Sequence, residues 1–311
     1  EASMKTTIIV AKNDAGQRLD KFILKRFKTM PKSLMHKYIR TKYIKLNGKK
    51  TTPEVFLNEG DVLTLYIKDE FFVESKKEYE FMKASKKLDI VYEDENIMLL
   101  DKKPGVIVHQ DKNYDADCMV NRVQRYLYEK GEYDPESDKA FSPALVNRID
   151  RNTGGIVIAA KNAETLRILN QKIKDREMDK RYLAVVEGTP KPQKGSLKGY
   201  LFKDAKKNRV FVTDTPQSGS KSCQTNYKTI ISKNGLTLVE CELITGRTHQ
   251  IRAQFAHAGH PLLGDGKYGK LDKRFDRTYQ ALYSYKLSFA FTTDAGSLAY
   301  LNGKTFRVEK V

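Results

Sequence analysis

Residues 147–160 read Asn147-Arg148-Ile149-Asp150-Arg151-Asn152-Thr153-Gly154-Gly155-Ile156-Val157-Ile158-Ala159-Ala160. An acidic residue between two arginines, followed by a glycine pair and an apolar run, predicts a charged loop that leads into a buried strand. Flanking guanidinium groups favour the ionised form of Asp150 and can orient it. A surface salt-bridge loop that ends in an ordinary glycine turn is an equally good interpretation of this segment alone.

A second segment, Asp179-Lys180-Arg181-Tyr182, leads into the apolar run Leu183-Ala184-Val185-Val186. Tyr182 therefore begins a predicted strand directly after three charged residues. A tyrosine in that place can stack on a base and use its phenol as a proton carrier. More commonly, such a residue is only an amphipathic aromatic at the edge of a strand.

A third segment, Thr245-Gly246-Arg247-Thr248-His249-Gln250-Ile251-Arg252, precedes a predicted helix that ends at Gly259. Thr248 is the expected N-cap of this helix. Arg247 would then lie just outside the helix N-terminus, where it can reach a carboxylate or a phosphate. A core-facing helix with a solvated arginine is again plausible for this segment alone.

The composition limits the class of protein. The 311 residues include 57 Lys and Arg against 39 Asp and Glu, and 40% of the residues are hydrophobic, so the chain can bury a core and has length for about two domains. Its longest uncharged apolar stretch, residues 154–160, is too short to cross a bilayer. The three cysteines form no CxxC pair, which predicts a reducing, cytoplasmic location and neither a disulfide scaffold nor a cysteine-ligated zinc site.

The net charge of +18 predicts a polyanionic partner, either nucleic acid or an acidic membrane face. The sequence predicts no amphipathic helix with a large apolar face, which argues against a membrane as the partner. Residues 12–50 carry much of the excess, with thirteen Lys and Arg against two acidic residues. In the same region, apolar residues at helical spacing predict a helix over 19–27, and Ser33 is a plausible N-cap for a second helix. Asn47-Gly48 then predicts a hairpin turn, and alternation predicts a strand over 62–67.

Two basic helices followed by a small hairpin-rich sheet resemble the S4 RNA-binding domain, which binds folded RNA through its positive helix face. The sequence therefore predicts an S4-like domain over residues 1–80 and a linker to about residue 87. Residues 88–311 form the predicted second domain, which opens with short strands at 90–92 and 97–100. Strands and helices mix there without regular alternation, which favours an α+β fold over a doubly wound sheet.

The three charged segments, in this order, resemble the core motifs of the RluA-type pseudouridine synthases, and Lys102-Lys103-Pro104-Gly105 with His109 resembles their opening motif. The resemblance spans residues 88 to about 291, and an S4 domain often precedes it in this family. It implies that residues 88–311 are a catalytic domain with a mixed, mainly antiparallel sheet. It implies an isomerase that extrudes a uridine from RNA and re-forms its glycosidic bond at C5, without a cofactor. Large-subunit ribosomal RNA is the first expected substrate and tRNA the second, and the enzyme is expected to act as a monomer without a membrane.

The resemblance also assigns residues. It implies that Asp150 is the essential aspartate, Tyr182 the active-site tyrosine and Arg247 the basic partner of the aspartate. Asp150 would either attack C1′ or remove the C2′ proton, and the sequence leaves both routes open. The implied substrate-binding residues are Arg148, which is associated with base flipping, Arg151, Thr153, His249 and Arg252.

Three positions depart from the commonest family pattern, which has His at the place of Asn147, Ser at that of Gly154 and His at that of Tyr283. The first two positions do not supply the nucleophile, so those two departures bear on fine geometry or substrate choice rather than on activity. No role is assigned to Tyr283.

Other interpretations are weaker. Residues 264–269 satisfy G-x-G-x-x-G, but they follow a proline-containing loop and Asp265 would repel a pyrophosphate. The spacing of His249, His257, His260 and Asp265 fits no common zinc site, so no metal is expected, and acidic residues do not cluster near the histidines as in a metal-dependent nuclease. The main alternative is a non-catalytic RNA-binding or ribosome-assembly protein with a degenerate synthase domain. The joint presence of Asp150, Tyr182 and Arg247 argues against it.

Overall fold

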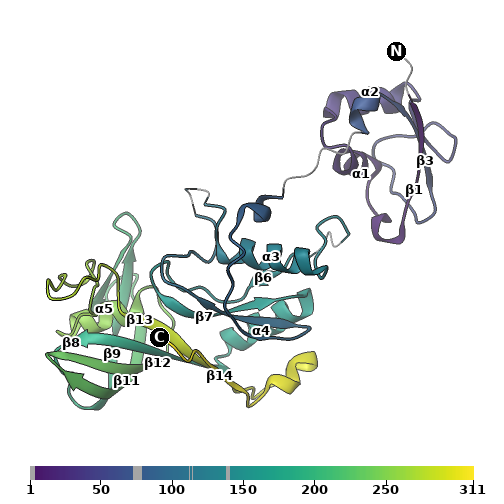
Figure 1. Cartoon of the computed structure of the whole chain (residues 1–311). Coiled ribbons are helices and arrows are strands. Elements are labelled where there is room, and N and C mark those ends of the chain that lie inside the picture. The colour runs from purple at the N-terminus through teal and green to yellow at the C-terminus, as the bar shows by residue number, and fades with distance from the viewer. Residues whose placement is uncertain (1–3, 73–78, 112, 114, 138–140) are drawn as a thin grey trace. The chain divides into compact units, whose positions relative to one another are not determined.

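The computed structural model describes residues 4–72, 79–111, 113, 115–137 and 141–311. The chain divides into two units, residues 1–78 and 79–311, which are described separately (Figure 1). The second unit begins earlier than the boundary expected near residue 88. The reason is that Phe81, in the short 3₁₀ helix η3 (Glu80–Lys83), is buried in the core of the second unit with Met98 and Val123.

The first unit contains two helices and a three-stranded sheet. Its elements are β1 (Met4–Ile9), η1 (Lys12–Asp14), α1 (Leu19–Arg26), α2 (Lys32–Arg40), β2 (Ile44–Leu46), β3 (Val62–Ile67) and η2 (Asp69–Phe71). The antiparallel sheet has the order β1-β3-β2, and α1 and α2 bury their apolar faces in one core with it. The predicted turn is confirmed, since Asn47 and Gly48 both have positive φ, at 51° and 73°. The expected cap is wrong, because α2 begins at Lys32 directly after Pro31.

The second unit is built on one large sheet. Its strands are β4 (Ile90–Glu93), β5 (Ile97–Lys102), β6 (Ala144–Leu145), β7 (Gly154–Ala160), β8 (Met178–Glu187), β9 (Lys194–Asp204), β10 (Arg209–Thr213), β11 (Lys221–Lys233), β12 (Leu236–Leu243), β13 (Leu282–Phe289) and β14 (Thr305–Arg307). Its helices are α3 (Met119–Lys130), α4 (Ala163–Lys174), α5 (Gln250–His257) and the 3₁₀ helix η4 (Gly296–Leu301). The predicted strands at 90–92, 97–100 and in the apolar run after Gly155 are confirmed.

The strand order is β10-β9-β11-β12-β8-β13-β7-β5-β4, with β14 beside β13 and β6 beside β7. Only the pair β13–β7 is parallel among the strand pairs of the described residues. The expected α+β fold with a mainly antiparallel sheet is therefore confirmed. Within those same residues, no helix has the length and apolar character needed to cross a membrane.

The junction of β7 and β13 positions the segment that carries Asp150. Tyr283 lies opposite Gly154 in the parallel pair, and a Cβ built on Gly154 would lie 2.7 Å from Cδ2 of the Tyr283 ring. The Tyr283 hydroxyl donates a hydrogen bond of 2.5 Å to Oδ1 of the buried Asp101 on β5. The departures from the family pattern at positions 154 and 283 are therefore linked by packing. The Tyr283 ring fills the space that a side chain at position 154 would need.

We predict that Gly154→Ser destabilises the second unit by about 1–3 kcal/mol, because the new side chain overlaps the Tyr283 ring. The double variant Gly154→Ser/Tyr283→His should lose less free energy of unfolding than the two single variants lose in sum. Hydrogen exchange of the β7 and β13 amides measures this free energy separately from the first unit. Gly246→Ser is the control, since nothing lies within 4 Å of its Cβ position. Strictly additive losses in the double variant would show that the two residues do not compensate each other.

Candidate active site

The three charged segments line one cavity of about 620 Å³ in the second unit. Asp150 comes from the loop before β7, Tyr182 from β8, and Arg247, His249 and Arg252 from the start of α5. Leu282 of β13, Lys203 of β9 and Asn208 of the turn between β9 and β10 complete the wall. Segments that are about 100 residues apart in the sequence therefore meet at the centre of the sheet.

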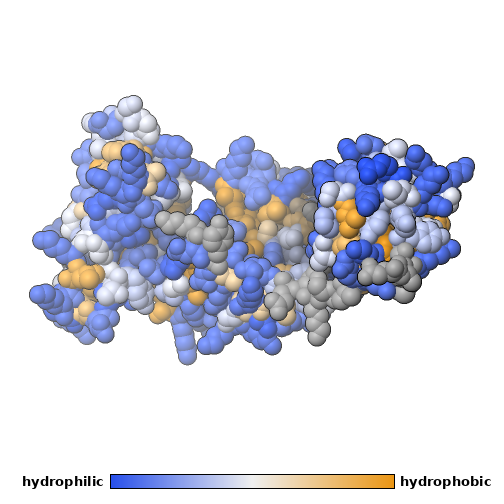
Figure 2. Space-filling view, turned by 90° about the horizontal axis from the view of Figure 1, so that it is seen from above, coloured by the Kyte–Doolittle hydropathy of each residue, from blue (hydrophilic) through white to orange (hydrophobic). Residues whose placement is uncertain are grey.

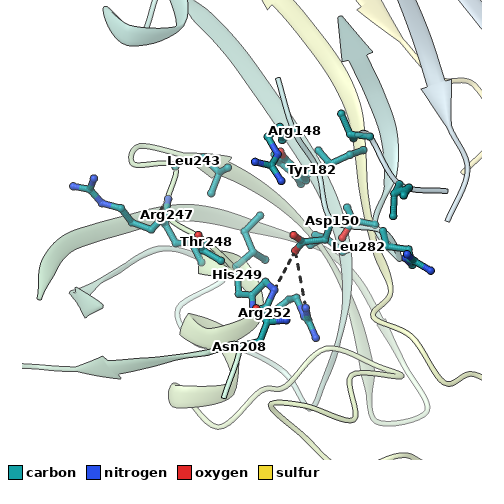
Figure 3. A pocket seen from close by; sticks show the side chains of 18 of the residues that line it. Arg148, Asp150, Tyr182, Asn208, Leu243, Arg247, Thr248, His249, Arg252 and Leu282 are labelled. Carbon is teal, nitrogen blue, oxygen red and sulfur yellow. Dashed lines mark hydrogen bonds and ion pairs between the residues drawn. The ribbon is translucent and has the colours of Figure 1, made fainter. Parts of the chain in front are cut away.

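Asp150 is partly exposed in this cavity, with 44% of its side-chain surface accessible. Its carbonyl accepts a hydrogen bond of 3.0 Å from the backbone N–H of Thr153, which closes the turn at the start of β7. His249 Nε2 lies 3.6 Å and Arg252 Nη1 lies 4.0 Å from the same carboxylate oxygen, Oδ2 (Figure 3). Two nitrogen-bearing side chains of the α5 region therefore converge on one oxygen of a solvent-accessible carboxylate.

Arg247 is not the partner of Asp150, which corrects the sequence-based assignment. Its Nε donates a hydrogen bond of 3.0 Å to the Ser222 carbonyl, and its side chain extends away from Asp150 (Figure 3). The reason is the geometry of the helix start. His249, not Thr248, occupies the N-cap position, in a left-handed conformation with φ 54°, and the Gln250 side chain accepts the Arg247 N–H at 3.1 Å. Arg252 lies three residues after His249, so both share the helix face that points to Asp150.

Arg252 is held by a second carboxylate. Its Nε and Nη2 donate to the two oxygens of Asp265 at 2.7 and 3.0 Å, and both side chains are buried. Burial by itself raises the pKa of Asp265, but the Arg252 guanidinium and the backbone N–H groups of Lys267 and Tyr268 lower it below its usual value overall. Asp265 is therefore ionised, and the bidentate pair leaves Nη1 of Arg252 directed at Asp150.

Tyr182 is a buried wall of the same cavity, with 8% of its surface accessible. It lies opposite Ser284 in the antiparallel pair of β8 and β13. Burial, together with the negative charge of Asp150, raises the pKa of Tyr182 to about 12. The phenol is consequently neutral at physiological pH and can stack or form hydrogen bonds, but it is not a phenolate base.

The opening motif supports the loop that carries Asp150. Lys102 is fully buried, and its Nζ donates to the carbonyls of Arg151 at 2.8 Å, Val106 at 2.6 Å and Lys103 at 3.2 Å. Burial lowers the pKa of Lys102 to about 8, while the Asp150 charge opposes this shift. A buried ammonium with three carbonyl partners therefore connects the turn after β5 to the loop at Arg151.

The remaining predicted substrate-binding residues line the cavity in different ways. Arg148 is exposed. Arg151 also lines the cavity, but its Nη2 donates to Asp111 at 2.8 Å. Thr153 is buried, and its hydroxyl accepts a hydrogen bond of 3.1 Å from the Gln280 side chain. The two arginines next to Asp150 in the sequence therefore form no ion pair with it within 4 Å, contrary to expectation, because the turn directs successive side chains apart.

Sequence reasoning missed Asp265 and Tyr268. Both lie in residues 264–269, where the sequence indicates only a weak nucleotide-binding motif and, at Asp265, a weak candidate metal ligand. Tyr268 contacts His249, with 2.7 Å between its hydroxyl and Nδ1. The available signal was an acidic and an aromatic residue between glycines directly after the helix of the third motif. Within the described ranges, no group of three or more His, Cys, Asp or Glu side chains could hold a metal ion.

Comparisons with known proteins identify the family of this chain. Residues 96–257 match the family described as RNA pseudouridylate synthase. An "uncharacterized RNA pseudouridine synthase" of Mycoplasma capricolum is 33% identical, covering 96% of each chain. The "ribosomal large subunit pseudouridine synthase C" of Escherichia coli K12 is 31% identical, covering 88% of this chain and 82% of the relative.

A solved structure, that of human RNA pseudouridylate synthase domain containing 4, shares the fold with a TM-score of 0.55 at 18% identity. The matched region covers 71% of this chain and 88% of the human chain. The sequence matches show more than a shared fold, because they are 33% and 31% identical and cover 96% and 88% of this chain. The chain therefore belongs to the family of RNA pseudouridylate synthases and is an isomerase.

Proposed function

We propose that this enzyme isomerises uridine in large-subunit ribosomal RNA, with Asp150 as the reacting carboxylate. The observation that carries the proposal is the accessible Asp150 carboxylate, which shares a cavity with the neutral Tyr182 phenol and has Arg252 and His249 within 4 Å. The cavity opens to solvent at charged residues and can admit an extruded nucleotide. The three cysteines are buried free thiols, which agrees with action in the cytoplasm.

The reaction rearranges bonds within one nucleotide. The N1–C1′ bond breaks with its electron pair going to the base, the base turns, and C5 forms a bond to C1′. The C5 proton is then lost and N1 gains a proton, so atoms and charge balance without a redox partner. Asp150 either donates an electron pair to C1′ or removes the C2′ proton, and in both routes it has to be ionised. The Nη1 of Arg252 lies 4.0 Å from Oδ2 of Asp150, so Arg252 takes the role that the resemblance implied for Arg247.

The other cavity residues have roles that follow from their positions. Tyr182 stacks on the detached base, and its neutral phenol donates or accepts a hydrogen bond there. Arg148 is exposed at the cavity and fills the space left by the extruded uridine. Arg247 and Arg151 lie at the rim, where each can meet an RNA phosphate. Thr153 acts indirectly, because it closes the turn that presents Asp150.

We predict that Asp150→Asn abolishes pseudouridine formation and leaves the dissociation constant for RNA within about threefold. The amide cannot supply the electron pair, whereas the cavity shape and the surrounding cations are unchanged. Pseudouridine formation is measured by product analysis and binding by filter retention at one salt concentration. Asp276→Asn is the control, since Asp276 is an exposed carboxylate outside the cavity lining. Pseudouridine formation by Asp150→Asn would show that another group reacts.

The name of one relative supports large-subunit ribosomal RNA as the proposed target. The Escherichia coli relative carries a ribosomal large-subunit name, and it covers most of this chain. We therefore expect pseudouridine mapping of total RNA to show large-subunit sites that disappear when the gene is deleted and return with the wild-type gene only, not with Asp150→Asn. Loss of tRNA sites instead would indicate the second candidate substrate. No change in any RNA would favour the alternative, a non-catalytic RNA-binding or assembly protein.

We further propose that the first unit is an S4-like domain that docks on folded RNA. Eleven basic side chains on and around its two helices are exposed, namely Lys12, Lys21, Lys25, Arg26, Lys28, Lys32, Lys37, Arg40, Lys42, Lys49 and Lys50. Figure 2 shows hydrophilic residues over most of the visible face of this unit. Scattered lysines of this kind suit phosphate contacts, which supply affinity and position rather than base recognition.

Neutralising three of these residues tests this docking role. We predict that Lys21→Gln/Lys25→Gln/Lys37→Gln weakens RNA binding and lowers the slope of log Kd against log salt by about 2–3, since each lost phosphate contact removes about 0.7–0.9. The turnover number at saturating RNA should be unchanged, because the cavity lies in the second unit. The control is Lys174→Gln/Lys304→Gln/Lys310→Gln, with the same charge change at exposed positions of the second unit. An equal slope in both triple variants would contradict the docking role.

A further inference from the structure

The contact between His249 and Tyr268 determines which nitrogen of His249 faces Asp150. The Tyr268 hydroxyl oxygen accepts a hydrogen bond of 3.0 Å from the Val210 backbone N–H, and the same hydroxyl lies 2.7 Å from Nδ1 of His249. Burial raises the pKa of Tyr268, so the phenol keeps its proton. With its oxygen already accepting from Val210, the phenol has one O–H to donate, and Nδ1 of His249 is the acceptor within reach.

The state of the His249 ring follows from its surroundings. Burial, which is the largest influence, and the positive charges of Arg252 and Lys267 lower the pKa of His249, while Asp150 and Asp265 oppose them and the net direction is downward. The ring is therefore neutral at physiological pH and carries one proton. If Nδ1 accepts from Tyr268, that proton is on Nε2, the nitrogen that lies 3.6 Å from Oδ2 of Asp150. The opposite tautomer would direct a nitrogen lone pair at the carboxylate.

Oδ2 of Asp150 thus has two potential donors, Nε2–H of His249 and Nη1–H of Arg252. The second oxygen, Oδ1, has neither a hydrogen-bond nor an ion-pair partner among the described residues. Contacts of 3.6 and 4.0 Å are longer than ordinary hydrogen bonds, and such contacts at catalytic groups tighten when a substrate excludes water. The two carboxylate oxygens therefore have unequal surroundings.

We infer that Tyr268 holds His249 in the tautomer with its proton on Nε2, so that His249 is a positioning residue that anchors Oδ2 and presents Oδ1 of Asp150 to the nucleotide. This inference rests on the proposed role of Asp150 as the reacting group. In either route, the electron pair that bonds to C1′ or to the C2′ proton comes from Oδ1. Val210 of β10, Tyr268 of the loop after α5 and His249 then form one hydrogen-bonded chain that leads to the reacting carboxylate.

Two substitutions of His249 separate its contact with Tyr268 from its contact with Asp150. His249 has φ 54°, a left-handed conformation that Asn adopts more readily than Gln or His. The amide of Asn occupies the place of Nδ1 and that of Gln the place of Nε2. His249→Asn therefore preserves the Tyr268 contact and relieves the backbone, but it removes the donor to Asp150. His249→Gln keeps that donor and loses the acceptor for Tyr268.

The experiment uses the full-length protein and large-subunit ribosomal RNA from cells that lack the gene. We expect His249→Asn to lower kcat about 10- to 100-fold and His249→Gln to lower it less, with similar KM values, since misplacing the reacting group affects turnover more than binding. Tyr268→Phe should lower kcat about tenfold. Tyr279→Phe is the matched control, because no hydrogen bond of the Tyr279 hydroxyl is present in the described structure and Tyr279 does not line the cavity.

A spectroscopic measurement tests the tautomer independently of activity. Nitrogen-15 spectra of histidine-labelled protein distinguish the two tautomers, and the His249 signals are identified by their loss in His249→Gln. We expect a neutral ring protonated on Nε2 in the wild type and a mixture of tautomers in Tyr268→Phe. A wild-type ring protonated on Nδ1, or His249→Asn at least as active as His249→Gln, would overturn the inference. Activity of Asp150→Asn would instead refute the proposed function, while the tautomer result would stand.

Discussion

A single buried guanidinium organises the site. Arg252 has lost most of its contact with water, so it needs a carboxylate partner with matching geometry, and Asp265 supplies one through two parallel hydrogen bonds of 2.7 and 3.0 Å. Breaking a buried pair of this kind costs about 3–5 kcal/mol, because it leaves one charge buried without a partner. The pair therefore fixes α5 against the loop of residues 264–269. The nitrogen that remains, Nη1, faces Asp150.

The strands of the sheet hold the loop that carries Asp150. Asp150 lies on a loop that Lys102 holds through the Arg151 carbonyl, and β7 after this loop pairs with β13. The pairing requires Gly154, whose missing side chain is replaced in space by the ring of Tyr283. Support for the Asp150 carboxylate thus comes from three strands and one helix that are distant in sequence. This distribution holds Asp150 in place while its carboxylate remains 44% accessible.

Charge is arranged in two different ways in this chain. The exposed lysines of the first unit are solvated, and charges of this kind are individually weak and gain effect only through their number. The arginine beside Asp150 is buried and paired, and its effect depends on atomic positions rather than on number. The net charge of +18 therefore reflects the first arrangement and gives no information about the second.

The sequence by itself determined the elements and the chemical class. Local patterns predicted α1, the Asn47-Gly48 turn, β3, β5 and β7, because propensity and periodicity act over a few residues. The motif order brought Asp150 and Tyr182 together correctly. The sequence could not determine which arginine faces Asp150, because Arg247 and Arg252 are equally basic and differ only in where the start of α5 directs them. Nor could it connect Tyr268 to His249 or Tyr283 to Gly154, since those contacts exist only once distant strands and loops have packed together.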